Sequence, residues 1–397
     1  MGLVNTILDQ MSKVSKAQRK FIAILLSSLL LVRGKATFRN LARYSAMCEK
    51  SYSRQFRKPF DFVGLNRVAL STTLASHLTL IAALDCTFVE KSGKLTHGLD
   101  RFFNGKTSRV ERGLELSELA VVCVELNTAY HLSARQTPCL DPKDMENNRI
   151  AFYVHHLTAD RPALPERVRY LVADGYYAKQ RFIDGVLATG LHLVSKLRHD
   201  ANLRHLYTGP QKARGRKRLY DGKVSFSDLS RMEWVAQEGG LCIYTAVVNS
   251  VRFKRTLRLV CLRRQSTGKS STALLFSTDT SLSALEIYRF YKARFQIEFL
   301  FRDARQFTGL TDCQARSAQS LHTHFNASLS ALSLAKIEEQ QLHQQDRPHV
   351  ISVANWKIRN FNDHLLQRFS DTLGLDFHSI KSQPHYEQLR NYGTVAK

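Results

Sequence analysis

Five residues in one stretch of the chain have types and spacings suited to binding a polyanion. Steps of three, four and seven residues return to nearly the same direction on an α-helix, so these side chains share one face. The face presents an aromatic hydroxyl, a carboxylate and guanidinium groups: Tyr291, Arg294, Glu298, Arg302 and Arg305, all within 283–307. A carboxylate among fixed cations suits a site that holds a metal ion and a polyanion together. An ordinary salt-bridged helix also fits, because Glu and Arg four residues apart often pair.

Two aspartates stand out by their placement. Asp85 interrupts the otherwise apolar stretch IAALDCTFV, and ionised groups are rarely buried without a partner. Asp174 closes the apolar stretch LVAD and precedes Gly175, which permits a sharp turn. In open α/β sheets the functional edge lies at the carboxyl ends of the strands, where we expect Asp174. A structural hydrogen bond for Asp85 and ordinary turn chemistry for Asp174 are the competing interpretations.

Asp85, Asp174 and Glu298 together favour a metal site. Three carboxylates held close repel one another, and divalent cations relieve that repulsion. Hard oxygen ligands favour Mg²⁺, with Mn²⁺ as a substitute. Two such ions about 4 Å apart can activate a water or hydroxyl and stabilise the leaving oxygen of a phosphodiester. Arg294 and Arg305 would then hold the flanking phosphates, with Tyr291 donating a hydrogen bond.

The charge of the chain points to the same class of partner. The 397 residues carry 58 Lys and Arg against 34 Asp and Glu, a net charge of +24. A globular chain this basic most often meets nucleic acid, with an anionic membrane surface as the main rival. The longest apolar run, 21–32, is too short to span a bilayer, so we expect a buried helix there. Seven dispersed cysteines without a CxxC pair indicate a reducing cytoplasm.

Several elements must position these residues. Residues 1–75 look helical and hold thirteen Lys and Arg against three acids. Two short helices at 37–45 and 51–58 resemble a helix-turn-helix, whose second helix would offer Arg54, Arg57 and Lys58 to DNA. Strands, helices and strands then alternate into a mixed sheet flanked by helices. The predicted strands are 78–91, 114–126, 129–137, 168–174, 191–198, 241–250, 256–264 and 273–279, and the predicted helices include 144–159, 176–189, 283–307, 315–341 and 358–373.

One loop is densely basic. The segment 211–218, QKARGRKR, includes Arg216 and Lys217 and could track phosphates, although a solvated loop explains it equally.

The signature helix resembles a known family pattern. Tyr291, Arg294, Glu298 and Arg305 resemble the Y-x2-R-x3-E-x6-K signature of bacterial insertion-sequence transposases of the IS-four family. ALDCT around Asp85 and LVADGYYAK around Asp174 look like that family's two aspartate motifs. The resemblance covers roughly 75–335. Arg305 departs from the pattern, which has Lys at this position. The planar guanidinium of Arg and the compact ammonium of Lys carry the same charge but bind with different geometry.

The resemblance implies an RNase H-like catalytic domain with a DDE triad. Asp85, Asp174 and Glu298 would be the catalytic metal ligands for two Mg²⁺ ions, and Tyr291, Arg294 and Arg305 would contact DNA. Trp234 would be the candidate to hold a flipped base in the insertion. The implied organisation is a helical DNA-binding domain (1–75), a first core segment (76–198), a β-rich insertion (199–280), a second core segment (281–340) and a helical tail (341–397).

The function we expect is that of a DNA transposase, which binds inverted terminal repeats and carries out two-metal cleavage and strand transfer. Joining two ends calls for at least a homodimer. The expected partner is double-stranded DNA, and no membrane is expected to take part. A cytoplasmic, nucleoid-associated bacterial protein is expected. Two alternatives stay open: a non-catalytic DNA-binding regulator derived from a transposase, and a general two-metal nuclease.

Overall fold

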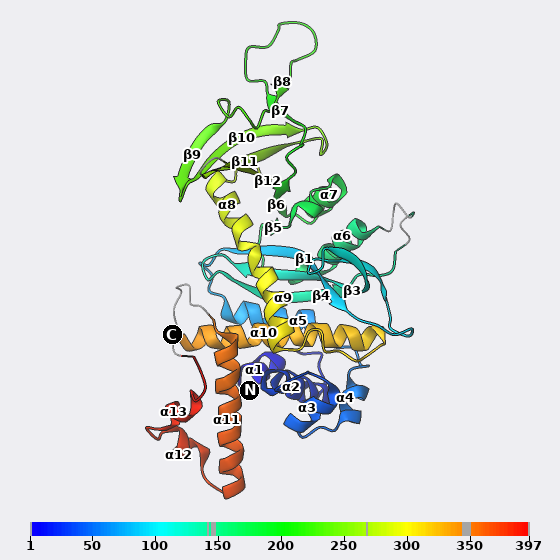
Figure 1. Ribbon diagram of the computed structural model, residues 1–397, viewed down its shortest axis with the longest axis vertical. Helices are drawn as coiled ribbons and strands as arrows, with labels where there is room; N and C mark the ends of the chain where they lie inside the picture. Colours follow the sequence, from blue (N-terminus) through cyan, green and yellow to red (C-terminus); the bar gives the residue numbers. More distant parts are fainter. Residues whose placement is uncertain (1, 141–142, 144–147, 267–268, 344–350, 396–397) are drawn as a thin grey trace.

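One large mixed sheet organises the chain (Figure 1). The computed structural model describes residues 2–395 except 141–142, 144–147, 267–268 and 344–350. Ten of the sheet's twelve strands run in the order β2-β3-β1-β5-β6-β12-β11-β10-β7-β8, while β4 pairs with β3 and β9 with β10. The strands are β1 (Leu80–Glu90), β2 (Asp100–Asn104), β3 (Arg109–Cys123), β4 (Thr128–Gln136), β5 (Tyr170–Val172), β6 (His192–Leu197), β7 (Leu203–Leu206), β8 (Tyr220–Lys223), β9 (Glu233–Glu238), β10 (Leu241–Ser250), β11 (Arg255–Ser266) and β12 (Lys269–Ser277).

The sheet is parallel only at its centre, where β5 runs between β1 and β6. Parallel neighbours need a crossover connection, usually a helix, and α6 (Arg149–Asp160) and α7 (Gln180–Ala188) lie in these two connections. All other described strand pairs are antiparallel. The eight strands expected from the sequence are confirmed within a few residues at their ends, and the architecture is a mixed α/β fold as predicted.

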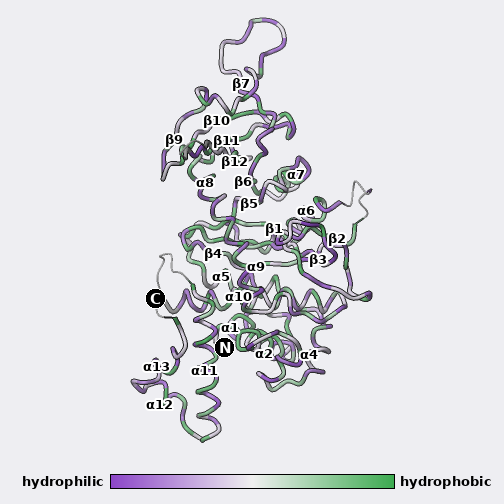
Figure 2. Tube along the Cα trace, in the orientation of Figure 1, coloured by the Kyte–Doolittle hydropathy of each residue, from purple (hydrophilic) through white to green (hydrophobic). Residues whose placement is uncertain are grey.

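The strands of the 199–280 segment continue the same sheet. β12 pairs with β6, and β11, β10, β7 and β8 follow outward in order. The three longest of these strands were expected, whereas β7, β8 and β9 are short and escaped the sequence pattern. Residues 211–218 lie in the exposed loop between β7 and β8, which projects from the end of the molecule and is mostly hydrophilic (Figures 1 and 2).

Helices cover both faces of the central sheet, with a separate buried core on each side. α2 (Lys16–Leu31) is buried through Leu25 and Leu26, and Ser15 caps its start by accepting a hydrogen bond from Gln18 N at 3.3 Å. Its burial confirms the prediction for 21–32, and no helix in the described residues is long and apolar enough to cross a bilayer. The remaining helices are α1 (Gly2–Asp9), α3 (Phe38–Leu41), η1 (Ala42–Tyr44), α4 (Glu49–Gln55), α5 (Phe62–Thr73), η2 (Arg161–Ala163), η3 (Gly175–Tyr177), α8 (Ala284–Ala293), α9 (Phe295–Phe307), α10 (Ala318–His343), α11 (Val353–Leu373), α12 (Phe377–Lys381) and α13 (Tyr386–Arg390).

The helix expected at 51–58 is displaced toward the N-terminus. Its structural counterpart, α4, begins at Glu49 and ends at Gln55, so Arg57 and Lys58 lie beyond its end. Pro59 also lies beyond that end. The chain leaves it through a turn in which Lys58 N donates to Gln55 O at 3.0 Å. Arg54, Arg57 and Lys58 are nevertheless all exposed.

The helix expected over 283–307 is two helices that meet at Arg294, so the prediction of one continuous helix was wrong. α8 begins with a capping box in which Ser283 and Glu286 bond each other's backbone. At the junction Ile297 N donates to Arg294 O at 3.0 Å, a three-residue step that tightens the turn. Arg294 itself keeps helical φ and ψ angles of −50° and −37°, so α8 and α9 follow one another through a single turn.

Candidate active site

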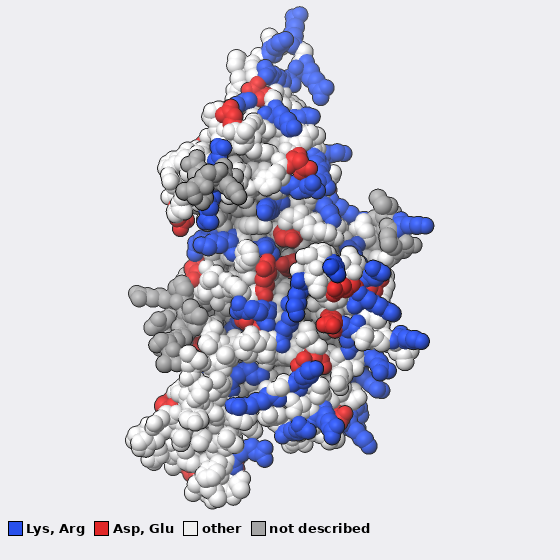
Figure 3. All heavy atoms as spheres, viewed as in Figure 1, with Lys and Arg blue, Asp and Glu red and all other residues white. Residues whose placement is uncertain are grey.

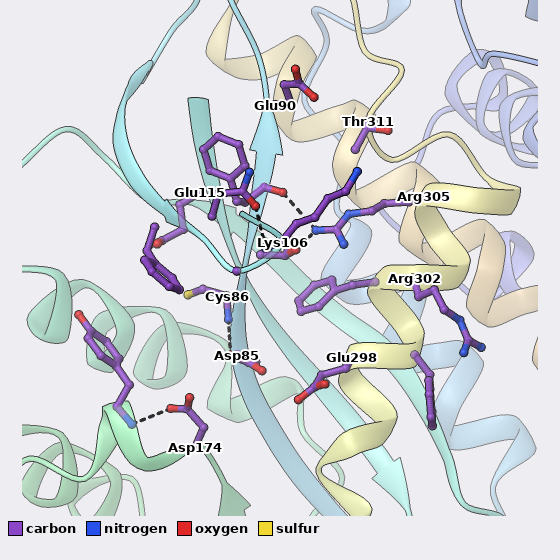
Figure 4. Close-up of a pocket in the computed structure, with 18 of the residues that line it drawn as sticks. Asp85, Cys86, Glu90, Lys106, Glu115, Asp174, Glu298, Arg302, Arg305 and Thr311 are labelled. Atoms are coloured by element: carbon purple, nitrogen blue, oxygen red, sulfur yellow. Dashed lines mark hydrogen bonds between the residues drawn. The ribbon is translucent and has the colours of Figure 1, made fainter. Parts of the chain in front are cut away.

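The two aspartates lie side by side because their strands are parallel neighbours. Ala82 and Ala83 of β1 are in register with Leu171 and Val172 of β5. Continuing this register by two positions brings Asp85 opposite Asp174, where adjacent strands are about 4.8 Å apart. Figure 4 shows both carboxylates directed into the same hollow. The sequence prediction that Asp174 lies at the carboxyl end of its strand is confirmed.

Asp174 is fixed by the turn that follows it. Its carboxylate accepts a hydrogen bond from Tyr176 N at 2.8 Å, and its carbonyl oxygen accepts one from Ser195 Oγ at 2.8 Å. The sharp turn expected after Asp174 is present as η3 (Gly175–Tyr177), although Gly175 has a φ that other residues also adopt. A Cβ at this position would stand 3.3 Å from the carbonyl oxygen of Lys196, and this close approach to β6 favours glycine.

Arg294 joins two of the three carboxylates. Its Nη1 donates to Asp85 Oδ2 at 3.1 Å and its Nη2 to Glu298 Oε1 at 2.8 Å. Only 8% of the Arg294 side chain is exposed, whereas 46% of the Glu298 side chain is exposed. Within the described structure Arg294 Nε has no hydrogen-bond partner. A buried donor without an acceptor indicates that bonding at this site is incomplete.

Asp85 has an unusual proton affinity. Burial, followed by repulsion from Asp174, raises its pKa from 3.8 to about 7, while the Arg294 guanidinium partly opposes this shift and Glu298 adds to it. Repulsion among carboxylates is the condition that a bound cation relieves. Asp174 and Glu298 therefore add to the free-energy cost of ionising Asp85.

The donor set fits a hard divalent cation in chemistry. All three groups are carboxylates, the ligands that Mg²⁺ and Mn²⁺ prefer, and they face one hollow. Across the described residues no three Asp, Glu, His or Cys groups are close enough to form a ready ion cage. Arg294 accounts for this spacing in part, because its guanidinium lies between Asp85 and Glu298.

The carboxylates open into a cleft of about 1210 Å³. One wall is α9, and the opposite wall includes the β2–β3 hairpin and the η3 turn (Figure 4). On the molecular surface, acidic side chains gather near the middle of one face and are bordered by Lys and Arg (Figure 3). A negatively charged centre with basic borders suits a metal-dependent reaction on a polyanion.

The other signature residues are placed unevenly. Arg305 lines the cleft, bonded to Thr87 Oγ1 and, at 3.1 Å, to the carbonyl oxygen of Phe88. Arg302 also lines it, with 62% of its side chain exposed. Tyr291 is half-buried and stands beside Arg294, whose guanidinium carbon is 5.7 Å from the centre of its ring. The structure thus brings Arg294 and Tyr291 to the triad and sets Arg305 further along the cleft.

The remaining predicted DNA contacts lie outside the cleft. Arg54, Arg57 and Lys58 are on the N-terminal helical part, and Arg216 and Lys217 are in the exposed β7–β8 loop. Trp234, on β9, is 59% exposed rather than buried in the β-rich segment. None of these six is among the residues that line the cleft. Their contacts to DNA stay predictions.

The sequence interpretation missed the buried polar groups under the cleft. Tyr153 donates to Glu115 Oε1 at 2.6 Å, and Tyr177 donates to Cys86 Sγ at 3.2 Å. It also missed Lys106, at the tip of the β2–β3 hairpin. Neither pair left a clear signal, since Glu115 lies in the alternating stretch LELSEL rather than in an apolar run.

The comparison with protein families identifies the class. Residues 10–247, more than half of the chain, match the family described as DDE superfamily endonuclease, and the chain belongs to this family. The match includes Asp85 and Asp174 and ends before Glu298. The family defines a transposase-like endonuclease whose substrate is DNA and whose chemistry generally uses divalent metal ions. A search of curated proteins finds no match to the chain.

Proposed function

We propose that the protein is a DNA transposase of the insertion-sequence type, similar to the IS-four family, with an RNase H-like core. The observation that carries the proposal is that Asp85, Asp174 and Glu298 line one end of a cleft to which Lys and Arg side chains also contribute. The mixed sheet and the membership in the endonuclease family are consistent with it. The division into helical N-terminal, core, β-rich, second core and tail segments is part of the proposal.

Asp85, Asp174 and Glu298 would hold two Mg²⁺ ions, or Mn²⁺ in their place. When bound, the ions supply Lewis-acid stabilisation of the charge that develops on a phosphodiester. The chain's own residues orient the reaction. Arg294 ties Asp85 to Glu298, and the backbone N–H of Tyr176 fixes the Asp174 carboxylate. We infer that water cleaves the strand at the end of the element and that the freed 3′-hydroxyl then joins target DNA.

DNA would lie along the cleft and over the basic surface around it. Arg302 and Arg305 line the cleft and would contact backbone phosphates. The N-terminal cations and the β7–β8 loop would bind the terminal repeats away from the reaction centre. Two ends must meet before joining, so the active form would be at least a dimer, located with the DNA in a bacterial cytoplasm.

The test is a nicking assay on labelled duplexes that carry the DNA flanking this protein's gene. Nicking at a terminal-repeat boundary with Mg²⁺ or Mn²⁺, which is retained in excess unrelated DNA, is the expected result. If excess unrelated DNA instead abolishes nicking of the labelled duplex, the protein is a general nuclease. Specific binding without nicking under any divalent metal would establish a DNA-binding regulator.

A further inference from the structure

A second hollow, of about 370 Å³, adjoins the catalytic cleft. Tyr176 lines both hollows, and it follows Asp174 by two residues. The second hollow is bounded by the η3–α7 junction on one side and by the turn between β10 and β11 on the other. A strand that reaches Asp174 therefore meets this hollow next.

Two cations from distant segments line this hollow. Lys179 follows η3, and Arg252 lies in the β10–β11 turn. Within the described part of the chain, neither forms an ion pair with a carboxylate. A third cation in the hollow, Arg198, is paired with Asp200 at 3.0 Å and is therefore less available.

The ammonium of Lys179 is held in place rather than free to follow solvent. Its Nζ lies 3.9 Å from the centre of the Tyr176 ring, in the range of a cation–π contact. Burial, and then the nearby Arg252, lower the pKa of Lys179, while Asp174 acts in the opposite direction. Two like charges kept close without a carboxylate are stabilised by an anion placed between them.

We propose that this hollow is a phosphate-binding subsite, in which Lys179 and Arg252 together hold one backbone phosphate of the DNA strand that crosses Asp174. The planar guanidinium offers paired donors to two phosphate oxygens, and the ammonium acts as a point charge beside them. Tyr176 separates the subsite from the catalytic carboxylates and sets the distance between the two. The inference rests on DNA being the substrate.

The test measures DNA binding of four variants: Lys179→Gln, Arg252→Gln, the double variant and Lys254→Gln. Lys254 is an exposed cation in the same turn as Arg252 and does not line the hollow, so it controls for the lost charge. The probe is a labelled 20-base-pair duplex of mixed sequence, because phosphate contacts do not depend on sequence. Binding is followed by fluorescence anisotropy at several salt concentrations, and thermal unfolding confirms that each variant is folded.

Each single variant of the pair should weaken binding by about tenfold, the loss expected for a charged hydrogen bond. Because both side chains hold the same phosphate, the double variant should be little weaker than either single one. Its slope of log affinity against log salt should fall by about 1. Lys254→Gln should bind like the native protein.

A second duplex series carries the terminal-repeat boundary, which fixes the binding register, and has one neutral methylphosphonate at each position in turn to locate the phosphate. The native protein should lose affinity at one position next to the cleaved bond, and the double variant should not respond there. If the Lys179 and Arg252 variants lose no more DNA affinity than Lys254→Gln does, while the native protein nicks DNA, the subsite is overturned and the proposed function stands. If the affinity losses of the two single variants multiply in the double variant, the two side chains do not hold the same phosphate, and that part of the proposal is overturned. Failure of the native protein to bind any DNA would remove the proposed function as well.

Discussion

Replacing Asp85 by Asn should stabilise the protein at alkaline pH while abolishing cleavage. The folded protein keeps the proton on Asp85 up to about pH 7, whereas the unfolded chain loses it near 3.8. Between these values the folded state binds more protons, so the native protein loses stability as the pH rises. Asparagine has no proton to lose, so the advantage of the variant grows through this window and levels off above pH 7.

The size of this effect follows from the pKa. The difference between 3.8 and about 7 corresponds to roughly 4 kcal/mol at 1.36 kcal/mol for each pH unit. This figure already includes the attraction between Arg294 and the ionised Asp85, which opposes the shift, so nothing further is subtracted for that contact. In a cooperative chain of 397 residues a gain of this size raises the Tm by about 5 °C.

The assay is thermal unfolding of the native protein and Asp85→Asn in EDTA at pH 5 and pH 8. The difference in Tm between variant and native protein should be more positive at pH 8 than at pH 5. Added Mg²⁺ should then raise the Tm of the native protein at pH 8 more than that of the variant, because the variant has lost a carboxylate ligand. A difference in Tm that is the same at both pH values would refute the reasoning, because Asp85 would then titrate alike in both states.

Three further predictions concern the neighbours of the triad. Arg294→Ala leaves Asp85 and Glu298 without their shared cation, so the free energy of unfolding should fall by about 3 kcal/mol. Added Mg²⁺ should then stabilise the variant by more than it stabilises the native protein. An equal stabilisation by Mg²⁺ would contradict this role of Arg294. Gly175→Ala crowds the carbonyl of Lys196 and should cost about 1 kcal/mol while reducing nicking more than DNA binding, which a parallel anisotropy measurement checks. Arg305→Lys keeps the charge but loses the geometry of the two hydrogen bonds that Arg305 Nη2 donates to Thr87 and Phe88, so DNA affinity should fall by less than for Arg305→Gln. Equal losses would show that charge is not what matters there.

Local patterns were enough to locate the carboxylates. Asp85 drew attention because it interrupts an apolar strand, and Asp174 because it ends one. Parallel pairing of β1 and β5 then brings the two together without any further signal in the sequence. Glu298 was found through helical spacing, which survives on α9 although the helix is broken.

Other features depend on contacts that a local pattern does not contain. The interruption at Arg294 is a single tightened turn, and the hydrogen bond of Arg294 to Asp85 joins residues that lie far apart in sequence. The continuity of the 199–280 strands with the central sheet rests on the pairing of β12 with β6. Strand β2 is short and has a polar, half-exposed pattern, so periodicity did not reveal it. The proximity of Lys179 and Arg252 likewise arises only when the chain folds.

The most direct test of the central claim compares single substitutions in the nicking assay with Mg²⁺. Asp85→Asn, Asp174→Asn and Glu298→Gln should each abolish nicking of the labelled terminal-repeat duplex, because each removes one of the three converging carboxylates. Glu90→Gln is the matched control, since Glu90 is a carboxylate at the far end of the same cleft (Figure 4). We predict nicking for the control alone. Native-level nicking by any of the three triad variants would contradict the assignment of that residue to the catalytic site.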